Sequence, residues 1–312
     1  MAEEYINIGY QVDILASSGS AIKGATIIVN GTTGFPQSKK QRLLSLLKTW
    51  TYLLINYKDY YLIQNFGRLL FLLPIIRSNN RKLMCYQRKI SSRNIKIVSK
   101  LLPNNLNFFG CSNDMVLKNH LLGNWRVIYN PIKSMGFQLQ SNYLLDSPLI
   151  FLSRIDREKG CHIAIEVAKM TNNRLIIAGN KSSVPSEALY FDSAIKPNID
   201  GKQIVYVGEL DDEQKNFYLG KAKAMLFPIL WDEPFGIVMI ESMICGTPVI
   251  AFNRGSVNEV IDEGITGFKV NDKYNMADAL SKISSIDRKI CHEHAKKRFD
   301  ISVIASQYLS VE

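Results

Sequence analysis

The sequence predicts an α/β protein of two domains, each built around a parallel sheet. Three observations support this fold class. Short apolar runs alternate with amphipathic stretches along most of the chain, and this alternation is typical of βαβ units. The length of 312 residues suits two domains of about 150 residues each. Hydrophobic residues make up 46% and charged residues 21% of the chain, which indicates packed cores and not disorder.

The alternation is most regular in the C-terminal half. Helical patterns at Gly160–Met170 and Asp211–Ala222 separate short apolar runs. Strands connected in this way are parallel, and their carboxyl ends meet at the edge of the sheet where ligands bind. We expect these strands at Leu149–Ser153, Arg174–Ala178, Ile204–Val207, Ala224–Pro228, Pro248–Phe252 and Gly267–Val270.

The N-terminal half is less regular. It begins with a helical pattern at Met1–Ile8, where a doubly wound domain normally has a strand and a tight glycine turn. A helix-rich insert covers Lys39–Tyr57, and Leu69–Ile76 is interpreted as a buried helix because it is far shorter than the ~20 residues that span a bilayer. The polar stretch 134–147 lacks periodicity, so the domain boundary is placed between residues 133 and 134. Strands are expected at Gln11–Ala16, Thr26–Asn30, Tyr60–Gln64, Lys82–Tyr86, Asn107–Ser112 and Arg126–Asn130.

The charge balance points to an anionic partner. The net charge is +10 and the pI is near 9.2, which suits nucleic acid, an acidic membrane surface or a phosphate-bearing ligand. Lysine and arginine are spread along the chain without a nucleic-acid-binding motif, which argues against nucleic acid. The first ten residues include Glu3 and Glu4 and resemble no signal peptide.

Cysteine and histidine usage indicates neither a disulfide framework nor a metal site. The five cysteines are scattered without a CxxC pair, so a reducing cytoplasm is the expected location. His292 and His294 do not share a helix face at a spacing of two, and we expect them at the surface. The other two histidines are His120 and His162.

The densest chemical signal lies in residues 232–251, after the strand that ends at Pro228. Glu233 is expected in a loop, and Gly236 allows the backbone to turn close to a ligand. A helix from about Ile237 would point its free N–H groups and its positive dipole end at that ligand. Glu241 could accept two hydrogen bonds from a ribose diol, or it could merely offset the helix dipole. The spacing Glu-x7-Glu, with Phe-Gly between and Gly-Thr-Pro after, favours a binding site.

This block resembles the donor-site signature of retaining GT-B glycosyltransferases, family four of the glycosyltransferase classification (glycosyl transferases group 1). Residues 151–160 are similar to that family's Gly-Arg-Leu…Lys-Gly element, with Ser153 where glycine is usual. The resemblance implies two Rossmann-like domains whose parallel sheets face each other across a cleft. Residues 1–133 would form the acceptor-side domain and residues 134–312 the nucleotide-sugar domain. The last helix, about 295–310, is similar to one that often packs back on the first domain.

The resemblance also assigns roles to individual residues. Glu233 would meet the transferred sugar and Glu241 the ribose. Arg154 and Lys159 would bind the donor diphosphate, a role for which a guanidinium and an ammonium provide fixed positive charge. The implied catalytic residues are Glu233, Arg154 and Lys159, and the implied donor-binding residues are Glu241, Phe235, Gly236, Ile237, Gly208, Glu209 and Leu210.

The N-terminal half resembles the family's acceptor domain more weakly. Asn65, Arg68 and Arg88 are acceptor-side candidates, although a structural or solvated role for both arginines remains equally open. Two features depart from the family pattern. Its opening strand and glycine-rich loop are missing before Met1, so the domain is expected to be incomplete, and Gln64 stands near the place of a frequent histidine.

The implied activity is transfer of a hexosyl group from a UDP- or GDP-sugar to a glycan, glycoconjugate or lipid, with retention of configuration. Neither a metal nor a cofactor is expected, because Arg154, Lys159 and the helix terminus would stabilise the departing diphosphate. The alternative is an inactive or partner-dependent protein that keeps the donor pocket but lacks part of the acceptor domain. A peripheral association with a membrane is compatible with the charge.

Overall fold

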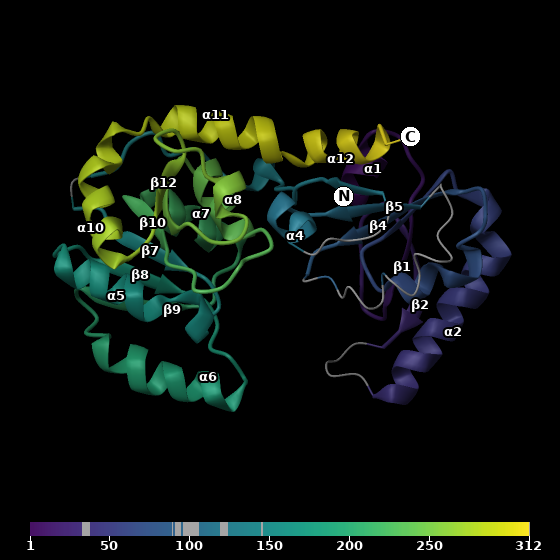
Figure 1. Ribbon diagram of the computed structural model, residues 1–312, viewed down its shortest axis with the longest axis horizontal. Coiled ribbons are helices and arrows are strands. Elements are labelled where there is room, and N and C mark those ends of the chain that lie inside the picture. Colours follow the sequence, from purple (N-terminus) through teal and green to yellow (C-terminus); the bar gives the residue numbers. More distant parts are fainter. Residues whose placement is uncertain are drawn as a thin grey trace. The chain divides into compact units, whose positions relative to one another are not determined.

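The computed structural model describes residues 1–32, 38–88, 90, 95, 106–118, 124–144 and 146–311. The chain divides into two compact units (Figure 1). Unit 1 comprises Met1–Tyr129 and Ala305–Glu312, and unit 2 comprises Asn130–Ile304. Unit 2 thus begins four residues before the boundary expected between 133 and 134. The reason is local pairing, because Ile132 donates its N–H to the Phe299 carbonyl (2.8 Å) and accepts one from Ile301 (2.9 Å).

Unit 2 is a six-stranded parallel sheet with helices between successive strands. Its strands pair in the order β12-β11-β10-β7-β8-β9. Their bounds are β7 Leu149–Leu152, β8 Leu175–Ala178, β9 Ile204–Gly208, β10 Ala224–Phe227, β11 Val249–Phe252 and β12 Gly267–Val270. The helices are α5 Cys161–Met170, α6 Pro185–Tyr190, α7 Asp212–Lys221, α8 Ile237–Ile244, α9 Val257–Val260, α10 Lys273–Lys282 and α11 Arg288–Phe299. All six expected strands are confirmed within one residue at each end.

The order of the strands in unit 2 creates a switch point beside β7. Leu149 of β7 pairs with Leu175 of β8 on one side and with Ala224 of β10 on the other. The chain runs outward from β7 through β8 to β9, and then returns to β10 and runs outward to β12. In a parallel sheet, the crevice at the carboxyl ends of the strands at such a reversal is the usual ligand site.

Unit 1 has two parallel sheets. Strands β1 Asp13–Ser17 and β2 Thr26–Gly31 form one sheet, and the order β3-β4-β5-β6 forms the other. The six expected strands are present with ends shifted by up to three residues. The remaining elements are β3 Leu62–Asn65, β4 Arg81–Tyr86, β5 Leu106–Gly110, β6 Trp125–Val127, α1 Ala2–Asn7, α2 Lys39–Asn56, α4 Asn113–Leu117 and α12 Ile301–Leu309.

Two expected helices differ from the prediction. The buried segment forms a 3₁₀-helix at Leu69–Ile75, because Pro74 lacks the N–H that an α-helix needs at this position. The expected last helix at about 295–310 is divided into α11 and α12, which follow each other along the yellow ribbon of Figure 1. The break lies at Asp300, whose extended backbone pairs with Ile132 in an isolated parallel bridge.

Candidate functional site

The loops that follow β7 and β10 approach each other closely at the switch point of unit 2. Gly160 ends the loop after β7 with a backbone φ of 76°. A Cβ atom at Gly160 would lie 2.0 Å from the carbonyl oxygen of Pro228, directly after β10. Only glycine fits this left-handed conformation and this approach. The side chains of both loops are therefore held next to each other.

Lys159 and Glu233 form an ion pair between these two loops. The Lys159 ammonium contacts Oε2 of Glu233, and both side chains are largely buried. The indole N–H of Trp231 donates to the same oxygen (2.9 Å). The ammonium also lies 5.1 Å from the centroid of the Trp231 ring, which is within range of a cation–π interaction. Two side chains, Lys159 and Trp231, thus fix the Glu233 carboxylate at the edge of the sheet.

The backbone around Glu233 is anchored to the loops on both sides. The Ser256 N–H, after β11, donates to the Glu233 carbonyl (3.0 Å). The Leu230 N–H donates to the carbonyl of Glu158 in the loop after β7 (2.8 Å). These bonds fix the position of Glu233 before any ligand binds, which is the condition for strong electrostatic recognition.

Glu241 lies on α8 and pairs with a lysine that the sequence did not predict. Its Oε1 is 2.8 Å from Nζ of Lys215 on α7, and the residue is only 9% exposed. Nζ is also 2.7 Å from Oδ1 of Asp212. Burial lowers the pKa of Lys215, but the two carboxylates raise it by more, so the net pKa lies above its ordinary value. Lys215 is therefore charged at neutral pH.

Arg154 lies on the same loop as Lys159 but makes a different ion pair. Its Nε contacts Oδ2 of Asp156, and its side chain is 59% exposed. The other carboxylate oxygen of Asp156 is buried and has no hydrogen-bond partner among the residues that the structure describes. Of the two predicted cations, Lys159 contacts Glu233 whereas Arg154 contacts Asp156, and the cation beside Glu241 is Lys215. The roles of Arg154 and Lys159 in donor binding stay predictions.

Helix α8 begins directly after the predicted glycine, Gly236. Gly236 has a φ of 76°, and no side chain of the described residues caps the helix there. Phe235 is buried, with its ring centroid 5.9 Å from that of Phe299, and its carbonyl accepts a hydrogen bond from the Ser256 hydroxyl (2.8 Å). Ile237 opens α8 with its side chain exposed. Anchored in this way, the first amides of α8 form a candidate anion site.

The loop after β9 carries the predicted base-flanking residues. Gly208 ends β9, and its carbonyl accepts the Gly179 N–H at the end of β8 (2.7 Å). The Tyr206 hydroxyl donates to the Gly179 carbonyl (2.9 Å). Glu209 is exposed and Leu210 is half-buried. These bonds hold the ends of β8 and β9 together and leave Glu209 in solvent.

The acceptor-side candidates lie in unit 1. The side chain of Asn65 accepts the Gly67 N–H (2.8 Å) and donates to the Arg68 carbonyl (2.9 Å), so it shapes the loop after β3. The side chains of Arg68 and Arg88 are exposed. An acceptor role for these residues stays a prediction.

The expected surface position of the histidines on α11 is wrong for His292. Its side chain is only 12% exposed, and its Nδ1 hydrogen bonds to the Ile244 carbonyl (2.5 Å), because α11 packs against α8. His294 is half-buried and lies 3.3 Å from Asp262. His162 is half-buried against Tyr190, and His120 lies outside the described residues.

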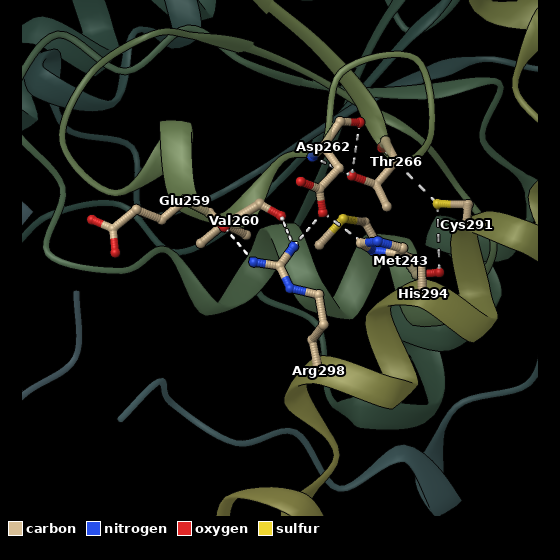
Figure 2. A network of polar contacts seen from close by, with 8 residues as sticks. All are labelled: Met243, Glu259, Val260, Asp262, Thr266, Cys291, His294 and Arg298. Carbon is tan, nitrogen blue, oxygen red and sulfur yellow. Dashed lines mark hydrogen bonds and ion pairs between the residues drawn. The ribbon is translucent and has the colours of Figure 1, made fainter. Parts of the chain in front are cut away.

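A polar network around Arg298 holds the short helix α9 in place (Figure 2). The guanidinium of Arg298 donates to the carbonyls of Glu259 (2.5 Å) and Val260 (3.3 Å) and to Oδ2 of Asp262 (2.5 Å). A cation that binds the last carbonyls of a helix satisfies groups that would otherwise lack partners. Helix α9 follows directly after Ser256, so Arg298 stabilises the segment that anchors Glu233.

Two further findings concern metals and membranes. Across the described residues, no three His, Cys, Asp or Glu side chains gather as a metal ion would require. Nor does any helix there have the length and apolar character needed to cross a bilayer.

Comparison with known sequences finds a family that the segment carrying the site resembles. Residues 146–298 match the family described as glycosyl transferases group 1. A phosphatidyl-myo-inositol mannosyltransferase of Propionibacterium freudenreichii is 31% identical over 132 residues, which cover 40% of this chain and 34% of that protein. The chain spans less than half the length of the curated relatives that it matches.

Comparison with solved structures gives the fold. Sucrose-phosphate synthase of Thermosynechococcus elongatus superposes with a TM-score of 0.76 at 20% identity, covering 98% of this chain and 89% of that one. An Anabaena protein in complex with UDP-glucose superposes with a TM-score of 0.71 at 16% identity, covering 92% and 85%. Both matches extend over both units, and the GT-B fold expected from the sequence is confirmed. Residues 146–298 are therefore similar to the glycosyl transferases group 1 family, in a chain of the GT-B fold.

Proposed function

We propose that this chain transfers a hexosyl group from a UDP- or GDP-sugar to a glycan, glycoconjugate or lipid, with retention of configuration and without a metal. The observation that carries the proposal is the Lys159–Glu233 ion pair between the loops after β7 and β10. It places a fixed cation and a fixed carboxylate at the switch point of the sheet. The Anabaena neighbour crystallised with UDP-glucose supports the donor class.

Each part of the donor has a matching group in unit 2. The ribose diol binds the Glu241 carboxylate, one oxygen of which Lys215 already orients. The diphosphate binds Lys159, the exposed guanidinium of Arg154 and the first amides of α8. The sugar hydroxyls bind Glu233, while the loop at Gly208–Leu210 flanks the base.

The chemical step breaks the bond between the anomeric carbon and the diphosphate oxygen. The electron pair leaves with the nucleoside diphosphate, and the acceptor hydroxyl forms the new bond at the same carbon and gives its proton to the departing diphosphate. Negative charge develops on the leaving oxygen, and Lys159 and Arg154 stabilise it. Because Lys159 is already oriented by Glu233 and Trp231, little reorganisation accompanies this stabilisation.

A second candidate function is favoured by the divided sheets of unit 1. In that case the chain binds the nucleotide sugar in unit 2 but needs a partner to position an acceptor. The two candidates differ in turnover. A glycosyltransferase that is complete in itself releases nucleoside diphosphate from its donor when a suitable acceptor is present, whereas a partner-dependent protein binds the donor and releases none.

The test measures nucleoside diphosphate release from UDP- and GDP-sugars in the presence of glycan and glycolipid acceptors. We expect Lys159→Met to lower kcat/KM by roughly 10²–10³-fold, the effect of removing one oriented electrostatic contact to a transition state. Lys202→Met is the matched control, because this exposed lysine lies at the start of β9. An equal effect of the two variants would contradict the proposal.

A further inference from the structure

Helix α2 packs against the rest of unit 1 with one side only. Thr49 and Leu53 are its buried residues. The Thr49 hydroxyl accepts a hydrogen bond from the Asn30 side chain on β2 (3.0 Å), and the Trp50 indole donates to the Leu70 carbonyl (2.9 Å). These contacts fix which side of the helix faces outward.

The outward side of α2 is apolar. Five large aliphatic side chains are between 47% and 71% exposed there, namely Leu43, Leu44, Leu47, Leu54 and Ile55. At about 100° per residue they fall within an arc of about 120°, on the side away from Leu53. Scattered exposed aliphatic residues are ordinary, but five on one face of a single helix indicate a partner.

The same side of α2 is basic. Lys40 lies among the aliphatic residues, and Lys39 and Lys48 lie beside them, all three exposed. The segment 38–58 contains no aspartate or glutamate. Lysines in the first turn oppose the helix dipole, and no acidic residue offsets them there. The N-terminus of α2 is stabilised instead by a capping box between Ser38 and Gln41. The lysines therefore do not stabilise the helix, and their charge favours binding of an external anion.

We propose that the outward face of α2 docks on the surface of a lipid bilayer that contains anionic lipids. The helix lies in the plane of the interface, with its aliphatic side chains at the boundary between headgroups and acyl chains and its lysines at the lipid phosphates. This surface lies in unit 1, outside the donor site, and the inference goes beyond the proposed transfer reaction.

Charge favours a membrane over a second copy of the chain. A symmetric dimer through this face would bring the same residues of two copies together. Lys40 lies among the aliphatic residues and Lys48 lies at their edge, so such a dimer would bring like charges together, which disfavours association. An anionic bilayer instead complements the lysines and accepts the aliphatic side chains at once.

The test is co-sedimentation of the whole chain, without donor, with phosphatidylcholine vesicles that contain or lack phosphatidylglycerol. We expect binding to the anionic vesicles to exceed binding to the neutral ones. Leu47→Gln with Leu54→Gln should lower the partition coefficient more than about tenfold, because each leucine loses its burial in lipid. Lys40→Gln with Lys48→Gln should lower it by roughly fivefold per charge on anionic vesicles only.

The control variant carries Leu189→Gln and Lys202→Gln, an exposed aliphatic residue and an exposed lysine of unit 2, and should bind as the wild type does. Circular dichroism and Tm establish that each variant is folded. Lys159→Met should bind vesicles normally, so this inference can fail independently of the proposed activity. Vesicle binding that is absent in the wild type, or unchanged in both α2 variants, overturns the proposal. So does a dimer in sedimentation velocity that Leu47→Gln with Leu54→Gln dissociates.

Discussion

Unit 2 pairs its six described strands in one parallel sheet, whereas the six strands among the described residues of unit 1 pair in sheets of two and four. In unit 2 every residue of β7, β8, β10 and β11 is buried. In unit 1 no residue of β1, β2 or β3 is fully buried. Strands buried on both faces are fixed by packing. The loops that carry Lys159 and Glu233 therefore follow strands that are buried on both faces.

The two units also differ in the order of their strands. Unit 2 runs β9-β8-β7-β10-β11-β12, with its first strand, β7, joining the two wings of the sheet. Unit 1 runs β2-β1 in one sheet and β3-β4-β5-β6 in the other, and no described strand joins β1 to β3. The loop that follows β7 carries Arg154 and Lys159.

The largest change in stability is expected in unit 2, where the loops after β7 and β10 meet. Gly160→Ala would force a Cβ against the Pro228 carbonyl oxygen, and we expect a loss of more than ~3 kcal/mol in the free energy of unfolding of unit 2. Gly201→Ala is the matched control, because Gly201 has a similar φ of 71° with nothing within 4 Å of its Cβ position. It should cost about 1 kcal/mol. Equal costs in urea unfolding would contradict the close approach of the two loops.

A smaller effect is expected in unit 1, at a buried lysine. Nζ of Lys82 donates to the carbonyls of Ser78 (2.6 Å) and Asn80 (2.7 Å), and burial lowers its pKa. Lys82→Met leaves those carbonyls without this donor and should cost about 2–3 kcal/mol. Lys58→Met, at an exposed position, should cost little. Urea unfolding followed by a probe in unit 1 measures both, and an unchanged midpoint for Lys82→Met would show that this cation does not hold the unit together.

The sequence predicts the fold of unit 2 more fully than the contacts within its site. The strands of unit 2 were predicted within one residue because buried parallel strands are continuous apolar runs. The pairing of Lys215 with Glu241 was not predicted, because the two residues are 26 positions apart and their contact depends on how α7 packs against α8. The Trp231 contact was missed because its direction is set by the loop and not by spacing. The helix break at Asp300 depends on Ile132, which is far away in the sequence.

The smallest effect is expected at acidic pH, at the break between α11 and α12. Burial raises the pKa of Asp300, but hydrogen bonds from Ser134 and Ser302 lower it by more, so the net pKa lies below its ordinary value. The resulting stability is present above the ordinary pKa of 3.8 and is lost as the pH falls through the lower folded value. Asp300→Asn should therefore remove less than ~1 kcal/mol of the pH dependence of the free energy of unfolding, after solvent screening. The acid limb of a plot of Tm against pH should be flatter for this variant. A limb as steep as in the wild type would assign the acid sensitivity to other groups.

The proposed function requires Glu241 and its neighbours in unit 2 to hold the nucleotide of an activated sugar. Isothermal titration calorimetry of UDP and GDP against the wild type, Glu241→Ala and the exposed control Glu213→Ala tests it most directly. For the nucleotide that binds the wild type, Glu241→Ala should weaken binding by about 1.5–3 kcal/mol, the value of a hydrogen bond to a charged group, while Glu213→Ala leaves it unchanged. A folded Glu241→Ala variant that binds this nucleotide as tightly as the wild type would contradict the claim.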